Sequence, residues 1–158
     1  MLKRDWPDLL IQDCSQEEMR SWLEPWQWCL NGRVTPLFLS RFGCWFLQRP
    51  EGMVEMLDVF FGQVEEVAPS YETFLQSVDT PSWQEVYLLS DFVFRLHVAG
   101  KVAAGIDCYA IAPHPAVGGP DPWSAAPLDT ESVMIMDAPI WQGVCAQLLL
   151  TAREAGSS

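Results

Sequence analysis

The sequence predicts an α+β domain with a mainly antiparallel sheet covered by helices. Three observations support this class: closely spaced apolar runs between residues 34 and 67, two further strand-like runs near 106–112 and 132–136, and amphipathic helix patterns around them. Strands that follow one another directly, with helices grouped on either side, are typical of α+β architecture. With 158 residues, 49% of them hydrophobic, the chain fits a single domain over residues 1–158.

The segment 34–67 has the pattern of a β-meander. Its apolar runs, at about 34–40, 43–48, 53–59 and 63–67, are separated by short stretches of turn-forming residues. Connections this short join consecutive antiparallel strands as hairpins. Because an isolated meander is marginally stable in water, we expect helices before and after it to cover its apolar face.

Helix signals flank the meander. Ser15 and Glu18 form a capping-box pattern at the start of a short amphipathic helix, and Ser70 can cap another. A longer helix is expected over about 80–100, where apolar positions occupy most of the circumference. The last helix is expected over about 137–153. We predict that the helices 80–100 and 137–153 cover the sheet.

The chain is strongly acidic. It has 21 Asp and Glu residues against 9 Lys and Arg, a formal net charge of −12. Such a charge repels nucleic acid and attracts a basic partner, so direct DNA or RNA binding is not expected. Five acidic residues of the meander are candidate partner-binding residues: Glu51, Glu55, Asp58, Glu65 and Glu66. The alternative is that these charges protect a sheet edge and keep the protein in solution.

A long proline- and glycine-rich segment, 113–131, separates the last two predicted strands. Segments of this length without regular structure are unusual in compact domains and often carry function. Trp123 is the candidate hydrophobic anchor for a partner in this segment. The alternative is that proline and glycine only rigidify an exposed crossing.

No catalytic motif is present. The chain has no Gly-rich phosphate loop, H-E-x-x-H or G-x-S-x-G pattern, and no catalytic residue, cofactor or metal site is predicted. The five scattered cysteines are expected to be reduced and mostly buried. Cys108 with His97 or His114 stays open as a thiol nucleophile and its base. Without an apolar run of about 20 residues or a signal-peptide pattern, we expect a cytoplasmic protein and no membrane partner.

Four stretches occur in a characteristic order: PLFLSRFGCWFL, MVEMLDVFFGQVEEVAPSYETFL, CYAIAPHPAVGG and SVMIMDAPIWQGVCAQLL. In this order they resemble the C-terminal domain of bacterial immunity proteins that neutralise type VI secretion DNase effectors, a domain often found after a GAD-like domain. The resemblance covers about residues 30–150 and includes V-x-x-x-A-P-S at 64–70 and the pair Gly118-Gly119. The chain differs in its proline-rich insertion after Gly119 and in showing no GAD-like domain ahead of the meander.

The resemblance implies an immunity protein of interbacterial competition, one half of a toxin–antitoxin pair. Such a protein binds a cognate secreted toxin, for example a basic nuclease, by protein–protein interaction. An acidic surface of this chain would provide the contact. The alternative is a small-molecule-binding protein or a hydrolase with a pocket near the loop 113–131.

Overall fold

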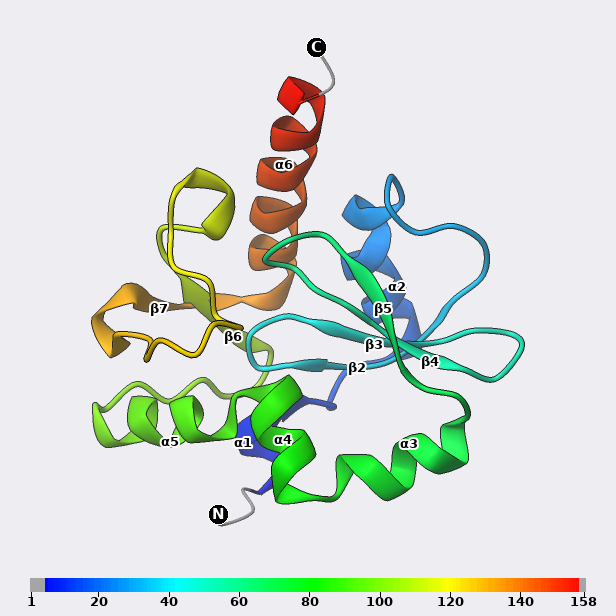
Figure 1. Cartoon of the computed structure of the whole chain (residues 1–158), viewed down its shortest axis with the longest axis horizontal. Helices are drawn as coiled ribbons and strands as arrows, with labels where there is room; N and C mark the ends of the chain where they lie inside the picture. Colours follow the sequence, from blue (N-terminus) through cyan, green and yellow to red (C-terminus); the bar gives the residue numbers. More distant parts are fainter. Residues whose placement is uncertain (1–4, 157–158) are drawn as a thin grey trace.

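The computed structural model describes residues 5–156, which form a five-stranded antiparallel sheet, a separate two-stranded sheet and surrounding helices (Figure 1). The larger sheet has the order β1-β2-β3-β4-β5. Its strands are β1 Leu10–Ile11, β2 Thr35–Ser40, β3 Trp45–Gln48, β4 Val54–Leu57 and β5 Val64–Ala68. The predicted meander and the α+β class are confirmed.

The helices lie where capping signals and apolar periodicity place most of them. They are α1 Trp6–Leu9, α2 Gln16–Leu23, η1 Glu24–Trp26, α3 Tyr71–Val78, α4 Pro81–Leu88, α5 Ser90–Val98, η2 Pro115–Val117, η3 Thr130–Ser132 and α6 Ala138–Gly156. The predicted capping box forms at α2, because Ser15 Oγ accepts from the Glu18 amide and Glu18 Oε1 accepts from the Ser15 amide, both at 3.0 Å. The short elements α1 and β1 were not predicted, since neither is long enough to show a period.

The central strands β3 and β4 of the larger sheet are buried on both faces. Neighbouring residues of β3 point to opposite faces, as the period of a strand requires. Trp45 faces α6, where its Nε1 donates to Gln142 Oε1 at 2.9 Å. Phe46 faces α4, where its ring centroid lies 5.4 Å from that of Trp83. In Figure 1, α2 and α6 accordingly lie on one side of the sheet and α3 and α4 on the other, which confirms that helices cover it.

The predicted helix over 80–100 is wrong in one respect, because it is two helices. Leu89 has a left-handed φ of 55° between α4 and α5. The carboxylate of Glu85 accepts hydrogen bonds from the amide of Asp91 at 2.8 Å and the hydroxyl of Ser90 at 3.1 Å, and so caps the second helix. The apolar periodicity continues across the break, so it did not reveal the change of direction.

The strands expected near 106–112 and 132–136 are β6 Asp107–Ile111 and β7 Val133–Asp137. They pair antiparallel with each other and form their own sheet beside the meander. The main link between the two sheets is at Arg41, whose carbonyl accepts from the Tyr109 amide at 2.7 Å. Within residues 5–156, no helix has the length and apolar character that crossing a membrane requires.

Candidate functional site

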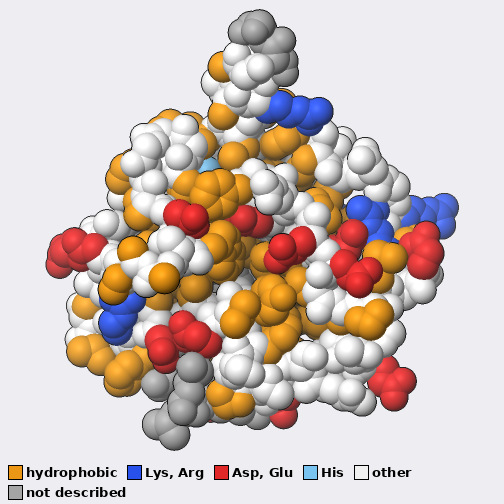
Figure 2. All heavy atoms as spheres, viewed as in Figure 1, with side chains coloured by type: hydrophobic (Ala, Val, Ile, Leu, Met, Phe, Trp, Pro, Cys, Tyr) orange, Lys and Arg blue, Asp and Glu red, His pale blue; other side chains and the backbone are white. Residues whose placement is uncertain are grey.

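A cleft of about 490 Å³ lies where the β4–β5 hairpin, α4 and the proline-rich segment 113–131 meet. On the face shown in Figure 2, acidic side chains border a hollow that is lined by hydrophobic side chains. The cleft residues are Met56, Asp58, Phe61, Gln63, Glu65, Val86, Tyr87, Asp121 and Trp123. We call this feature the acidic cleft, because three carboxylates contribute to a lining that also includes aromatic rings.

Strand geometry explains which acidic residues reach the cleft. Met56 of β4 lies directly opposite Glu65 of β5, and both line the cleft. The neighbouring pair in the same ladder is Glu55 opposite Glu66. Because successive side chains of a strand alternate between faces, Glu55 and Glu66 point away from the cleft. The five acidic residues predicted as one surface are therefore divided between faces.

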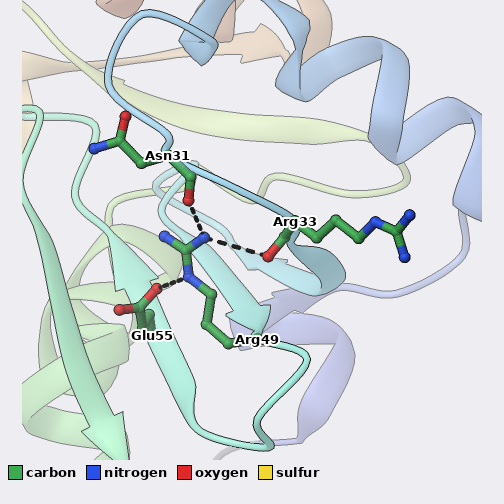
Figure 3. Close-up of polar contacts among 4 residues, drawn as sticks. All are labelled: Asn31, Arg33, Arg49 and Glu55. Atoms are coloured by element: carbon green, nitrogen blue, oxygen red, sulfur yellow. Dashed lines mark hydrogen bonds and ion pairs between the residues drawn. The ribbon is translucent and has the colours of Figure 1, made fainter.

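Glu55 lies beside Arg49 (Figure 3). The guanidinium of Arg49 forms an ion pair with Glu55 and donates to the carbonyls of Asn31 and Arg33. Glu51 lines the same shallow hollow as Glu55 and both arginines. The ion pair with Arg49 neutralises the charge of Glu55, so this glutamate contributes little to a net acidic surface.

Asp58 is buried, with only 7% of its surface exposed, and is not part of the exposed acidic surface that the sequence predicted. Its Oδ1 accepts from the Phe60 amide at 2.8 Å, and its Oδ2 accepts from Trp123 Nε1 at 2.9 Å. Burial raises the pKa of the carboxyl from 3.8 to about 6, although these hydrogen bonds favour the charged form. Among residues 5–156, no lysine, arginine or histidine forms an ion pair with Asp58.

The proline-rich segment is held against the turn that follows β4. His114 is 3% exposed, and its Nε2 lies 2.9 Å from the Val59 carbonyl. Its Nδ1 accepts from the Ala116 amide at 3.0 Å, which places the ring proton on Nε2 as a donor to Val59. Burial lowers the pKa of His114, which favours this neutral ring. With the bond from Trp123 to Asp58, two side chains of the segment hold it beside the cleft.

The cleft brings together three of the predicted site residues: Asp58, Glu65 and Trp123. Tyr87 and Asp121 also line it and were not predicted as site residues. Tyr87 continues the apolar pattern of the helix predicted over 80–100, and this pattern indicates core packing rather than a site. Asp121 carries no signal in the sequence beyond its place in the proline-rich segment.

The thiol and imidazole groups do not assemble a nucleophilic site. Cys108 is fully buried, and burial raises the pKa of its thiol to about 12. His97 Nε2 lies 3.1 Å from the Tyr109 hydroxyl, and His114 is bonded to Val59. No hydrogen bond joins Cys108 to either histidine in the part of the chain that the structure describes. Across the same residues, no group of three or more His, Cys, Asp or Glu side chains is arranged to hold a metal ion.

Replacing Asp58 with asparagine is expected to change how the stability of the protein depends on pH. The folded-state pKa of about 6 lies above the ordinary 3.8, so the contribution of Asp58 is fully favourable below about pH 3.8 and is lost as the pH rises to 6. The stability of Asp58→Asn relative to wild type should therefore rise between pH 4 and pH 7 by at most about 3 kcal/mol, offset at every pH by about 1–3 kcal/mol because the asparagine NH2 group cannot accept from Phe60 or Trp123. Urea denaturation of both proteins across this pH range measures the difference in the free energy of unfolding. Because His114 is present in both proteins, its titration cancels in this difference. A difference that does not change with pH would contradict the proposed burial of a charged carboxylate.

The comparisons with known proteins support the fold. No protein-family model matches the chain, and no curated protein matches it. Among solved structures, the chain is similar to Atu4351 from Agrobacterium tumefaciens, known from a crystal structure, with a TM-score of 0.60 and 17% sequence identity. The similarity covers 85% of this chain and 65% of the Atu4351 chain. At this level of identity, the likeness establishes a shared α+β fold and nothing about activity.

Proposed function

We propose that this chain is an immunity protein that neutralises a basic secreted bacterial toxin, such as a type VI secretion nuclease, by direct binding. The observation that carries the proposal is the acidic cleft, in which Asp58, Glu65 and Asp121 lie among aromatic side chains. The resemblance of residues 30–150 to immunity domains supplies the class of partner. Binding would take place in the cytoplasm, where a nuclease toxin reaches DNA.

Charge complementarity supports a basic toxin. A nuclease holds DNA through positively charged groups, because the phosphate backbone dominates affinity for nucleic acid. This chain carries a net charge of −12 and presents carboxylates around a hollow. Such a surface attracts and orients the same basic groove that the toxin uses for its substrate. Occupying the groove would exclude DNA.

The position of each carboxylate predicts its kinetic role. Glu65 and Asp121 are exposed at the cleft, whereas Asp58 is buried. Exposed charges at the edge of an interface mainly raise the association rate, and salt screens them. Buried charged groups and aromatic anchors mainly slow dissociation. We therefore assign steering to Glu65 and Asp121, and retention of the toxin to Asp58 and Trp123.

The cleft also supports a second candidate, a small-molecule-binding protein or hydrolase. Its volume of about 490 Å³ lies within the usual range of ligand pockets, and Asp121 and Trp123 of the proline-rich segment line it. Turnover of a small substrate by the purified chain, without any protein partner, would favour this alternative. A stoichiometric complex with a toxin would favour immunity.

Co-expression with the toxin encoded beside its gene is expected to yield a stoichiometric complex and to protect the cells. The double variant Glu65→Gln, Asp121→Asn should associate about 3- to 10-fold more slowly at low salt, and this difference should fade at high salt. Stopped-flow or surface-based kinetics at two salt concentrations measure both effects. The single variants Glu65→Gln and Glu66→Gln are the matched pair, because each removes one negative charge and they do so from opposite faces of β5. Absence of both complex and protection would refute the immunity function.

A further inference from the structure

Resting on the proposed immunity function, we infer that the acidic cleft receives one arginine side chain of the toxin. The cleft joins a buried carboxylate, two exposed carboxylates and aromatic walls in a single hollow. An arginine has an apolar stem and a planar cationic end with five donors. Each part of the cleft has a counterpart in that side chain.

Asp58 places a buried carboxylate in the cleft. A charged group removed from water is costly unless a partner of opposite charge accompanies it. Asp58 is more than nine-tenths buried, lines the cleft, and has no cationic partner within residues 5–156. Its oxygens accept from the Phe60 amide and Trp123 Nε1, and a hydrogen bond from the Phe61 amide also favours the charged form, whereas a carboxylate can accept about four. Capacity for a cationic donor therefore remains inside the cleft.

Aromatic and apolar side chains form the walls of the cleft. The rings of Tyr87, Trp123 and Phe61 line the hollow together with Met56. Guanidinium groups stack on aromatic faces, and the arginine stem packs against apolar surface. Lysine carries a compact, strongly hydrated ammonium group that matches such walls less well. The combination favours arginine over lysine.

Exposed apolar side chains lie at the edge of the cleft. Phe61 is 41% exposed and Val86 is 58% exposed, both at the cleft. Exposed apolar side chains around a buried polar centre exclude water from that centre when a partner docks, which is the arrangement found at interface hot spots.

A titration with a small arginine probe tests the cleft without the toxin. The probe is Nα-acetyl-arginine methylamide, and the reporter is the indole N–H resonance of Trp123, assigned by loss of its signal in Trp123→Phe. Because this N–H bonds to Asp58, it should shift in a saturable way as the probe binds. The citrulline analogue, which has the same shape without the charge, should produce no saturable shift. The lysine analogue should bind several-fold more weakly.

Two variants and one control decide which residues hold the probe. Asp58→Asn should weaken probe binding at least 5-fold, and Glu65→Gln should weaken it about 2- to 3-fold, because its charge is more exposed to screening. Glu66→Gln should bind as wild type does. Equal shifts with the arginine and citrulline probes, or unchanged binding in both cleft variants, would overturn the inference.

The toxin complex separates this inference from the immunity function. Asp58→Asn should raise the dissociation rate of the complex about 10-fold while leaving its stoichiometry unchanged. If both cleft variants bind the toxin as tightly as wild type, the arginine site is wrong and the immunity function stands. If wild type forms no complex with the toxin, the immunity function fails, and the probe titration alone decides whether the cleft is a cation site.

Discussion

Replacing Gln142 with leucine is expected to lower the free energy of unfolding by about 3–5 kcal/mol, although the two side chains are similar in size. Gln142 is fully buried in α6. Its Oε1 accepts from the indole N–H groups of Trp26 at 2.6 Å and Trp45 at 2.9 Å, and its Nε2 donates to the Gly43 carbonyl at 2.8 Å. Leucine would leave two donors and one acceptor buried without partners, at a cost of about 1–3 kcal/mol each.

The matched control is Gln147→Leu on the same helix. Gln147 is exposed and its side chain bonds to exposed Thr151 at 3.1 Å, so its replacement should change stability by less than about 0.5 kcal/mol. Urea denaturation of the wild type and both variants measures the difference. A loss below about 1 kcal/mol in Gln142→Leu would mean that apolar packing alone holds α6 on the sheet.

This glutamine marks a limit of reasoning from hydrophobic pattern. The pattern of the last helix predicts a buried stripe that includes Ile140, Trp141, Val144 and Cys145. Trp141 and Cys145 are buried as predicted, but Ile140 is 56% exposed and Val144 is 37% exposed. Gln142 takes a central buried position instead, because two tryptophans far away in the sequence supply its donors. A periodicity cannot reveal which polar residue has such partners.

The meander, in contrast, could be predicted because its contacts are local in the sequence. Its pairings join strands that follow one another directly, and their turns are short, so alternation and turn residues carry most of the necessary information. In the same way, alternation alone places Met56 and Asp58 on one face of β4 and Glu55 on the other. The sequence thus contains the division of the acidic residues between two faces, although their number suggests a single surface.

The rest of the cleft depends on a contact that local pattern does not encode. Trp123 reaches Asp58 across 65 positions of sequence, and this contact completes the cleft. The sequence identifies both residues as site candidates, for separate reasons: one as an exposed charge and the other as an exposed anchor. Their hydrogen bond changes both roles, since Asp58 is buried and Trp123 forms a wall. Proximity in the fold, and not residue type, defines this candidate site.

Replacing Arg41 with methionine is expected to destabilise the protein by about 3 kcal/mol and to loosen the contact between the two sheets. Arg41 is 4% exposed, and its guanidinium donates to the carbonyls of Pro7, Gly105 and Asp107 at 2.8–3.1 Å. Burial lowers the pKa of Arg41, so removing it also relieves a desolvation cost. The net loss is therefore smaller than the sum of about 1.5–3 kcal/mol for each hydrogen bond to a charged donor.

Two further variants separate the roles of Arg41. Arg41→Lys keeps the charge but not the planar fork, so it should recover only part of the lost stability. Arg20→Met removes an exposed arginine of α2 and should change stability by less than about 0.5 kcal/mol.

Native-state hydrogen exchange adds a local measurement, because the Tyr109 amide donates to the Arg41 carbonyl at 2.7 Å. In Arg41→Met, the exchange of this amide should accelerate, relative to wild type, more than the exchange of the amides within β3. Equal acceleration of both would show that Arg41 supports the whole fold rather than the junction between its sheets.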